Sequence, residues 1–346
     1  MPSLMTHPLE PRLAAYIAGR MPEASDLTVS DLERISGGAS RETYRFVLAW
    51  TEAGEARRRK LILRRDPPAS LIDTERRIEF EAYRAFAGSD VPVPAMLWLE
   101  EDPAALGHPF FVAEEIAGFQ ASPQMLFSGA YDAVLPAVAE RKWTILGRIA
   151  AADPDALGLT RWMDAPAPDA CWRRELDHWE VLIDRDQAEP LPVTRAAIRW
   201  LRANPPPPAQ KLSVVHGDYR TGNYLYDPSG EIHGVLDWEM CHLGDPLEDL
   251  GWSLQPVWSF GRTGLAGGLV PNDRAVAIWE RASGLSADPE ALRWWILFNC
   301  VKGQGIWVGS AAAFNRGGNR APIMVYPAWW LINAQDRAIL QVMEKL

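Results

Sequence analysis

Cysteines, long apolar runs and clusters of positive charge are all scarce in this sequence. The three cysteines, Cys171, Cys241 and Cys300, lie far apart without metal-type spacing, so we expect reduced thiols in a cytoplasmic protein. No run reaches the roughly 18 to 20 apolar residues that a membrane-spanning helix needs, and no basic stretch precedes an apolar one at the N-terminus. We therefore expect neither a membrane partner nor a signal peptide. The formal net charge of -10 argues against nucleic acid as a partner, because nucleic-acid-binding proteins present a basic face.

The first third of the chain has the pattern of a sheet around one helix. At 346 residues the chain is too long for one small core, and its first third alternates between apolar and polar residues as strands do. The basic run 57–60 is expected in a solvated hairpin turn. A glycine turn is expected at 36–40, a helix at 72–87, and short strands at 32–35, 42–48, 60–64, 96–99 and 110–113.

Beyond Gly118 the pattern becomes mainly helical. Helices are expected at 135–152, at 192–203 and along an apolar stripe near the C-terminus, with short strands at 212–215, 224–226 and 232–236. We therefore predict an α+β protein of two lobes. A small antiparallel-sheet N-lobe would occupy residues 1–117 and a larger, mainly helical C-lobe residues 118–346, with a hinge at 114–118.

A polar constellation in the C-terminal part suits phosphoryl transfer. Asp218 and Asn223 stand five positions apart on a loop between two predicted strands, and Asp237 ends the next strand. Phosphoryl transfer needs metal ligands and a carboxylate that orients and deprotonates the attacking hydroxyl, and the catalytic loop of protein kinases has Asp and Asn at this spacing. Each residue alone is more often a turn or cap residue, so the prediction depends on the combined spacing.

The segment 216–223, Asp237-Trp238 and the extension 243–250 together resemble the aminoglycoside phosphotransferase and choline kinase-like family. The resemblance implies a bilobal, protein-kinase-like fold, with ATP and Mg²⁺ as cofactors and a small-molecule hydroxyl as the phosphate acceptor. Residues 63–68 and 91–94 are most similar to the kinase-like domains fused to acyl-CoA dehydrogenases.

The resemblance also implies a role for each matching residue. Asp218 would orient and deprotonate the acceptor, with Arg220 as a second catalytic residue beside the transferred phosphate. Asn223 and Asp237 would bind Mg²⁺ through oxygen. His216, Asp245 and Asp249 would brace the loop. The nucleotide would be bound by the glycine turn (Gly37, Gly38, Ala39 and Ser40), by Arg64 with Glu79, and by the hinge residues Glu114 and Ile116.

Arg64 departs from the kinase pattern, which has Lys at this strand position. Arginine keeps the charge, but its planar fork is not geometrically equivalent to an ammonium. Helical periodicity does not decide whether Glu79 or Glu81 is its partner, and the family motif favours Glu79. The substitution also keeps a second class of function open, a kinase-fold module that binds nucleotide without turnover.

The acceptor is less determined than the donor. The likeness to the fused kinase-like domains suggests a hydroxy acid or its CoA thioester, whereas the family name suggests an aminoglycoside antibiotic. Residues 294–335 contain no Asp or Glu, which disfavours a cationic antibiotic. The tryptophans at 294, 295, 307, 329 and 330 either line the acceptor site or, more commonly for tryptophan, fill helix interfaces.

Overall fold

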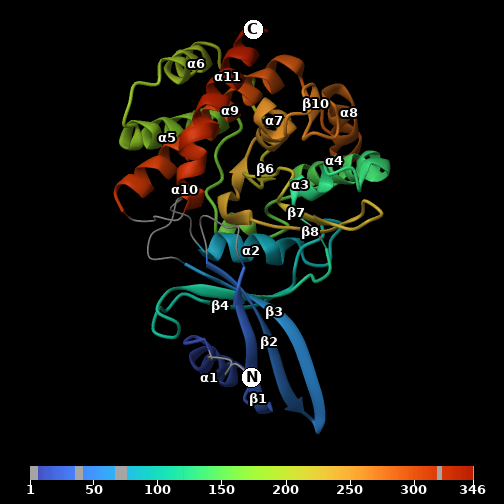
Figure 1. Ribbon diagram of the computed structural model, residues 1–346. Coiled ribbons are helices and arrows are strands. Elements are labelled where there is room, and N and C mark those ends of the chain that lie inside the picture. Colours follow the sequence, from blue (N-terminus) through green and yellow to red (C-terminus); the bar gives the residue numbers. More distant parts are fainter. Residues whose placement is uncertain (1–6, 36–41, 67–75, 120, 318–321, 346) are drawn as a thin grey trace.

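The computed structural model describes residues 7–35, 42–66, 76–119, 121–317 and 322–345. A sheet-rich part and a helical part are stacked on each other (Figure 1). The sheet has the order β1-β2-β3-β5-β4, and every pairing in it is antiparallel. Its elements are α1 (Glu10–Arg20), β1 (Ser25–Arg34), β2 (Glu42–Glu52), β3 (Glu55–Arg65), α2 (Arg76–Phe86), β4 (Met96–Glu100) and β5 (Phe110–Glu114).

Period-two burial explains how the sheet is covered. Alternate residues of β2, such as Phe46 and Leu48, are buried with Leu61 and Leu63 of β3 in a core that α1 closes through Leu13 and Ile17. Helix α2 lies between the sheet and the helical part, so its side chains can contact both (Figure 1).

The prediction of a hairpin turn at 57–60 is wrong. These basic residues lie within β3 and pair with β2, from Trp50 opposite Arg57 to Val47 opposite Lys60. The turn is at Ala53-Gly54, and both residues have positive φ (51° and 79°), as a tight two-residue hairpin requires. The basic side chains are exposed along the strand, and charged exposed residues suit a protruding ribbon of this kind.

The remaining chain builds the helical part around α9 (Pro289–Asn315). The short strands of this part form separate two-stranded ladders, β6 with β9 and β7 with β8. The elements are α3 (Pro123–Leu126), α4 (Leu135–Ala151), α5 (Cys171–Asp186), α6 (Pro192–Ala203), β6 (Ser213–Val215), β7 (Tyr224–Tyr226), β8 (Ile232–Val235), β9 (His242–Gly244), α7 (Leu247–Leu254), β10 (Leu265–Ala266), β11 (Val270–Pro271), α8 (Asn272–Ser283), α10 (Pro322–Tyr326) and α11 (Ile332–Met343).

This architecture confirms the predicted α+β class with an antiparallel sheet and a mainly helical second part. Trp294 and Trp295 on α9 are buried among helices, so these two fill interfaces, whereas Trp329 and Trp330 are exposed. Within the described ranges, no helix combines the length and the apolarity that crossing a bilayer would take. All three cysteines are buried free thiols.

Candidate active site

The β7–β8 hairpin brings the predicted metal ligands together. Its register pairs Tyr224 with Val235, and the Leu236 N–H donates to the Asn223 carbonyl at 2.8 Å. Asn223 and Asp237 therefore leave the same end of one hairpin. Because β7 begins where the loop 216–223 ends, that end of the hairpin also lies beside Asp218.

The Asp218 carboxylate is held by donors from three other residues. Oδ2 accepts from Asn223 Nδ2 at 2.7 Å, and Oδ1 accepts from Trp252 Nε1 at 2.9 Å and from Arg220 Nε at 3.2 Å. Burial raises the pKa of the Asp218 carboxyl above its ordinary value, against the lowering effect of the Arg220 guanidinium. A carboxylate that is rigidly oriented and more basic than usual suits a proton acceptor.

Asp249 and His216 hold the backbone of the loop, as the expected bracing role requires. The Asp249 carboxylate accepts the N–H of His216 at 2.6 Å and of Gly217 at 2.9 Å. The His216 ring accepts the Asp218 N–H at Nδ1 (3.1 Å) and faces the Leu236 carbonyl with Nε2 (3.0 Å). Burial lowers the pKa of His216 to about 4, so its ring is neutral near pH 7 and can accept that N–H.

Arg64 connects the sheet to the β7–β8 hairpin that carries the predicted metal ligands. Its Nη1 lies 2.7 Å from Glu79 Oε1, and its Nη2 lies 2.9 Å from Asp237 Oδ1. Glu81, the alternative partner left open by periodicity, instead faces Arg84 on the same helix. Burial opposes the charge on Arg64, but the carboxylates of Glu79 and Asp237 outweigh it and raise its pKa well above the ordinary value. One planar guanidinium thus contacts both carboxylates.

Asp237 has an unusual backbone conformation that a second contact supports. Its φ is 71°, a left-handed value that few residues other than glycine adopt. Its N–H donates to the Tyr83 hydroxyl at 2.8 Å. Burial would raise the pKa of the Asp237 carboxyl, but the Arg64 guanidinium lowers it below its ordinary value, so the group is ionised near pH 7. Strained residues of this kind are common at functional sites.

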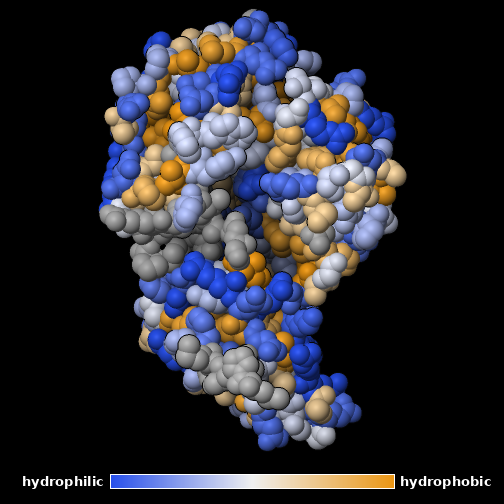
Figure 2. Space-filling view, in the orientation of Figure 1, coloured by the Kyte–Doolittle hydropathy of each residue, from blue (hydrophilic) through white to orange (hydrophobic). Residues whose placement is uncertain are grey.

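The donor set of this site fits Mg²⁺. Asn223 uses its amide nitrogen on Asp218, which leaves the amide oxygen for a cation, and Asp237 supplies ionised carboxylate oxygens. Amide and carboxylate oxygens are the ligands that this hard cation takes in proteins. A hollow with hydrophilic residues in its depth opens between the two parts of the molecule (Figure 2).

The structure places only some of the predicted nucleotide-binding residues at this site. Gly37, Gly38, Ala39 and Ser40 lie outside the described residues. Glu114 ends β5, and its N–H donates to the Ala95 carbonyl at 2.9 Å. Ile116 packs against Gly234 of β8, where a Cβ would come within 2.7 Å of Ile116 Cδ1. Ile116 therefore lies beside the hairpin that carries Asn223 and Asp237.

A row of tryptophan side chains, Trp252, Trp258 and Trp307, forms an aromatic wall beside the loop 216–223. The Arg220 guanidinium lies 5.0 Å from the ring centre of Trp258, which makes an edge contact with Trp252 at 5.4 Å. Trp307 of α9 makes an edge contact with Trp258 at 6.2 Å. Of the tryptophans considered from the sequence, Trp307 is the one that joins this wall. An arginine over an indole face gains a cation–π interaction, so Trp258 helps to hold Arg220 beside Asp218.

Sequence reasoning missed Trp252, Tyr83 and Lys302, which contacts the carbonyl of Gly217 at 2.7 Å. Their only sequence signal is a polar or amphipathic side chain at a buried helical position, which is too common to identify a site.

Comparisons with known proteins identify the family of this chain and proteins with the same fold. Residues 31–295 match the family model described as "Phosphotransferase enzyme family". A curated relative, acyl-CoA dehydrogenase family member 10 of Mus musculus, is 30% identical over 227 residues, which is 64% of this chain and 20% of the relative. The chain spans only a fifth to about a third of the length of the first curated relatives that it matches.

Solved structures show the same fold at low sequence identity. A Ralstonia eutropha protein named as a candidate aminoglycoside phosphotransferase superposes with a TM-score of 0.72 at 22% identity, covering 96% of this chain and 98% of the other. A thermostable mutant of aminoglycoside phosphotransferase APH(4)-Ia, solved as a ternary complex with ADP and hygromycin B, gives a TM-score of 0.59 at 20% identity, covering 95% and 98%.

Proposed function

The chain belongs to the phosphotransferase enzyme family, and from that membership we propose that it transfers the γ-phosphate of ATP, with Mg²⁺, to a hydroxyl of a small molecule. The observation that carries the proposal is the convergence of Asp218, Asn223, Asp237 and Arg64 at the end of one hairpin. A binding module that never turned over would have no need of a buried, oriented carboxylate such as Asp218.

Each residue has a chemical task in this reaction. Asp218 aligns the acceptor hydroxyl and takes its proton, while Asn223 and Asp237 hold the metal. Mg²⁺, when bound, neutralises phosphate charge. Arg64 and Arg220 supply fixed positive charge to the phosphates, and Glu79 is a buried partner that holds Arg64 in place. The nucleotide complex of a protein with the same fold supports ATP or a related nucleotide as the donor.

An Asp218→Ala variant tests the reaction. Turnover should fall by roughly 10³-fold or more, because the variant loses both alignment and proton acceptance. The thermal shift on adding Mg²⁺ and ATP should remain, because Arg64, Asn223 and Asp237 are unchanged. Asp90→Ala is the matched control, since the Asp90 side chain is 80% exposed on the surface. Wild-type-like turnover by Asp218→Ala would refute the assignment.

For the acceptor, a hydroxy acid or its CoA thioester is our leading candidate. A hollow of about 540 Å³ between the turn Pro256–Ser259 and helices α9 and α11 is lined by Arg293, Arg337 and Lys345, and no Asp or Glu is among the described residues that line it. Within the described ranges, none of these three cations forms an ion pair with a carboxylate. A cationic, partly apolar hollow suits an anionic acceptor body and opposes a polycationic aminoglycoside.

The turn Pro256–Ser259 lies between this hollow and the proposed catalytic loop and contacts both. Pro256, Val257 and Ser259 line the hollow, whereas Trp258 of the same turn packs on Arg220. The likeness to a protein with an acyl-CoA dehydrogenase name independently favours an acyl substrate.

A screen of ATP consumption decides between the acceptors. Hydroxy acids, hydroxyacyl-CoA thioesters and aminoglycosides are compared at equal concentration with Mg²⁺ and ATP. Faster ATP consumption with the anionic compounds is the expected result. A preference for an aminoglycoside would refute the anionic acceptor, and a nucleotide-dependent thermal shift without consumption by any compound would favour a binding module.

A further inference from the structure

Lys302, on α9, is a buried lysine that contacts the catalytic loop from the side of the protein interior. Its side chain is 1% exposed, and its Nζ donates to the carbonyl of Gly217 at 2.7 Å. It also lies 3.0 Å from Glu248 Oε1. A buried ammonium costs free energy unless it is paired and hydrogen-bonded, so a lysine kept here needs both contacts.

The bond from Lys302 fixes the peptide that leads into Asp218. The carbonyl of that peptide belongs to Gly217 and accepts from Lys302. Its N–H belongs to Asp218 and donates to the His216 ring at 3.1 Å. Both polar groups of one peptide plane are therefore held. Gly217 itself has a φ of +85°, and a Cβ there would lie 2.4 Å from the Met240 carbonyl oxygen. The plane that sets the direction of the Asp218 side chain has little freedom to rotate.

Lys302 reaches Asp218 by a second route through Trp252. Its Nζ lies 5.1 Å from the centre of the Trp252 ring, and the Nε1 of that ring donates to Asp218 Oδ1 at 2.9 Å. A cation over the indole face restrains the ring. One ammonium thus contacts the peptide before Asp218 and the indole that binds its carboxylate.

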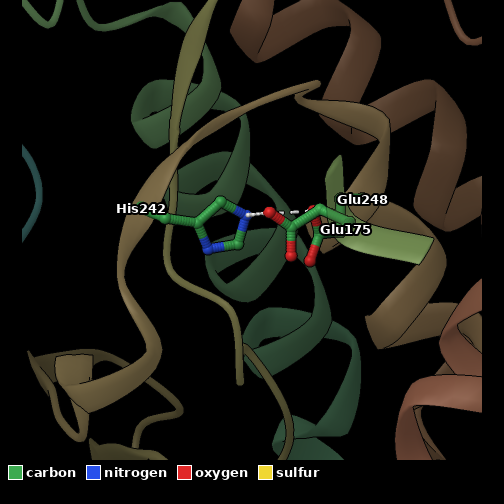
Figure 3. A group of neighbouring side chains, drawn as sticks. All are labelled: Glu175, His242 and Glu248. Carbon is green, nitrogen blue, oxygen red and sulfur yellow. Dashed lines mark hydrogen bonds and ion pairs between the residues drawn. The ribbon is translucent and has the colours of Figure 1, made fainter. Parts of the chain in front are cut away.

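Glu248 keeps Lys302 in place and is itself balanced by His242. The Nε2 of His242 lies 3.0 Å from Glu248 Oε2 and 3.6 Å from Glu175 Oε1 (Figure 3). The Nδ1 of the same ring lies 3.0 Å from the Met240 carbonyl. Both ring nitrogens face oxygen acceptors, which is the arrangement of a protonated imidazolium.

Glu175, His242 and Glu248 also have the spacing of metal ligands, but the cations that already neighbour these carboxylates oppose a metal ion. Lys302 pairs with Glu248, and Arg174 lies 2.8 Å from Glu175. With His242 protonated, these two carboxylates already face three cations. Adding a divalent ion would place further positive charge in a buried site, so the cluster serves as an ion-pair network.

We propose that Lys302 is a positioning residue for phosphoryl transfer, holding the Gly217–Asp218 peptide and the Trp252 ring so that the Asp218 carboxylate faces the acceptor hydroxyl. The kinetic side of this inference rests on the proposed function. The structural side does not, because it concerns only the order of the loop. One measurement of loop order and one of kinetics therefore distinguish a failure of the positioning role from a failure of the proposed function.

Hydrogen exchange tests the structural side without turnover. In Lys302→Met, amides of the segment 216–223 should exchange at least about 10-fold faster than in the wild type, because the loop opens locally more often. Exchange in α2 should not change. Lys211→Met is the control, since Lys211 also donates to backbone carbonyls, those of Ala151 and Ala152. Unchanged exchange in the segment 216–223 would overturn the inference, whatever the activity.

Kinetics separates positioning from stability. Lys302→Met should lower kcat by about 10- to 100-fold, the effect of a displaced catalytic group, with the KM for ATP unchanged. The double variant Lys302→Met/Glu248→Gln removes one buried cation and one buried carboxylate together, so it should regain stability but not kcat. If kcat recovers with Tm, Lys302 is only structural and the inference fails.

If Lys302→Met does not accumulate as folded protein, hydrogen exchange in the segment 216–223 and kcat are both measured on the double variant instead. Absence of any Mg²⁺- and ATP-dependent turnover in the wild type would refute the proposed function, and loop exchange would still decide the role of Lys302.

Discussion

Replacing His242 by glutamine should change how the stability of this protein depends on pH. His242 is half-buried on β9, with its two ring nitrogens facing the Met240 carbonyl and the Glu248 carboxylate. Burial favours the neutral ring, but the carboxylates of Glu175 and Glu248 outweigh burial and raise the pKa of His242 to about 9. The proton on this ring is therefore bound more tightly in the folded protein than in the unfolded chain.

The sign and size of the effect follow from this difference. A raised pKa contributes stability that is fully present below the unfolded value of about 6.5 and is lost as the pH rises through the folded value of about 9. The difference of roughly 2.5 pH units corresponds to about 3 kcal/mol, at about 1.4 kcal/mol per unit. Between pH 6.5 and pH 9.5, the free energy of unfolding of the wild type should therefore fall by up to about 3 kcal/mol relative to that of His242→Gln.

Urea unfolding of both proteins across this pH range measures the effect. The comparison between proteins matters, because other groups with shifted pKa values titrate in both and largely cancel. His178→Gln is the matched control: burial lowers the pKa of His178, so above about pH 7.5 its ring is neutral in both the folded protein and the unfolded chain. The difference in unfolding free energy between His178→Gln and the wild type should therefore stay flat above that pH. If the difference in unfolding free energy between His242→Gln and the wild type is equally independent of pH, the His242 ring is neutral and does not balance the charge of Glu248.

Three further variants test the proposed site. Glu79→Gln should lower the free energy of unfolding in urea by about 3 kcal/mol, because it removes a fully buried carboxylate from Arg64. Glu81→Gln on the same helix should lower it by less than about 1 kcal/mol. Gly217→Ala should lower Tm and activity together, because the residue has a φ of +85° and no room for a Cβ; normal stability would contradict the tight packing. Trp252→Phe removes a hydrogen bond to the loop carboxylate, so the acidic limb of the kcat profile should move up by about one pH unit, and an unmoved limb would argue against that carboxylate as the base.

Much of the fold could be predicted because the relevant signals are local. Alternation of apolar residues located β2, β4 and β5, whereas the strand predicted at 32–35 overlaps only the end of β1; the helix predicted at 192–203 matches α6. The turn at 57–60 was wrong because a run of charge looks the same on an exposed ribbon as in a turn, and only the pairing of β3 with β2 distinguishes them. The division of the chain at 117 and 118 stays a prediction.

The candidate site was predictable where its residues are close in the chain. Asp218 and Asn223 share one loop, and a single hairpin brings Asp237 to them. The pairing of Arg64 with Glu79 was a choice between two glutamates that helical periodicity could not make, and the packing of α2 decides it.

By itself, the sequence determined the class of fold and predicted a catalytic loop with oxygen ligands for a metal, since each depends on residue type at short, regular spacing. Only the tertiary structure decided which groups hold that loop: Trp252 from α7, Lys302 from α9 and Tyr83 from α2. These residues are distant along the chain, and their chemistry depends on burial. A buried lysine, tyrosine or tryptophan acquires a fixed hydrogen-bond partner only when folding brings the two groups together and removes water from them.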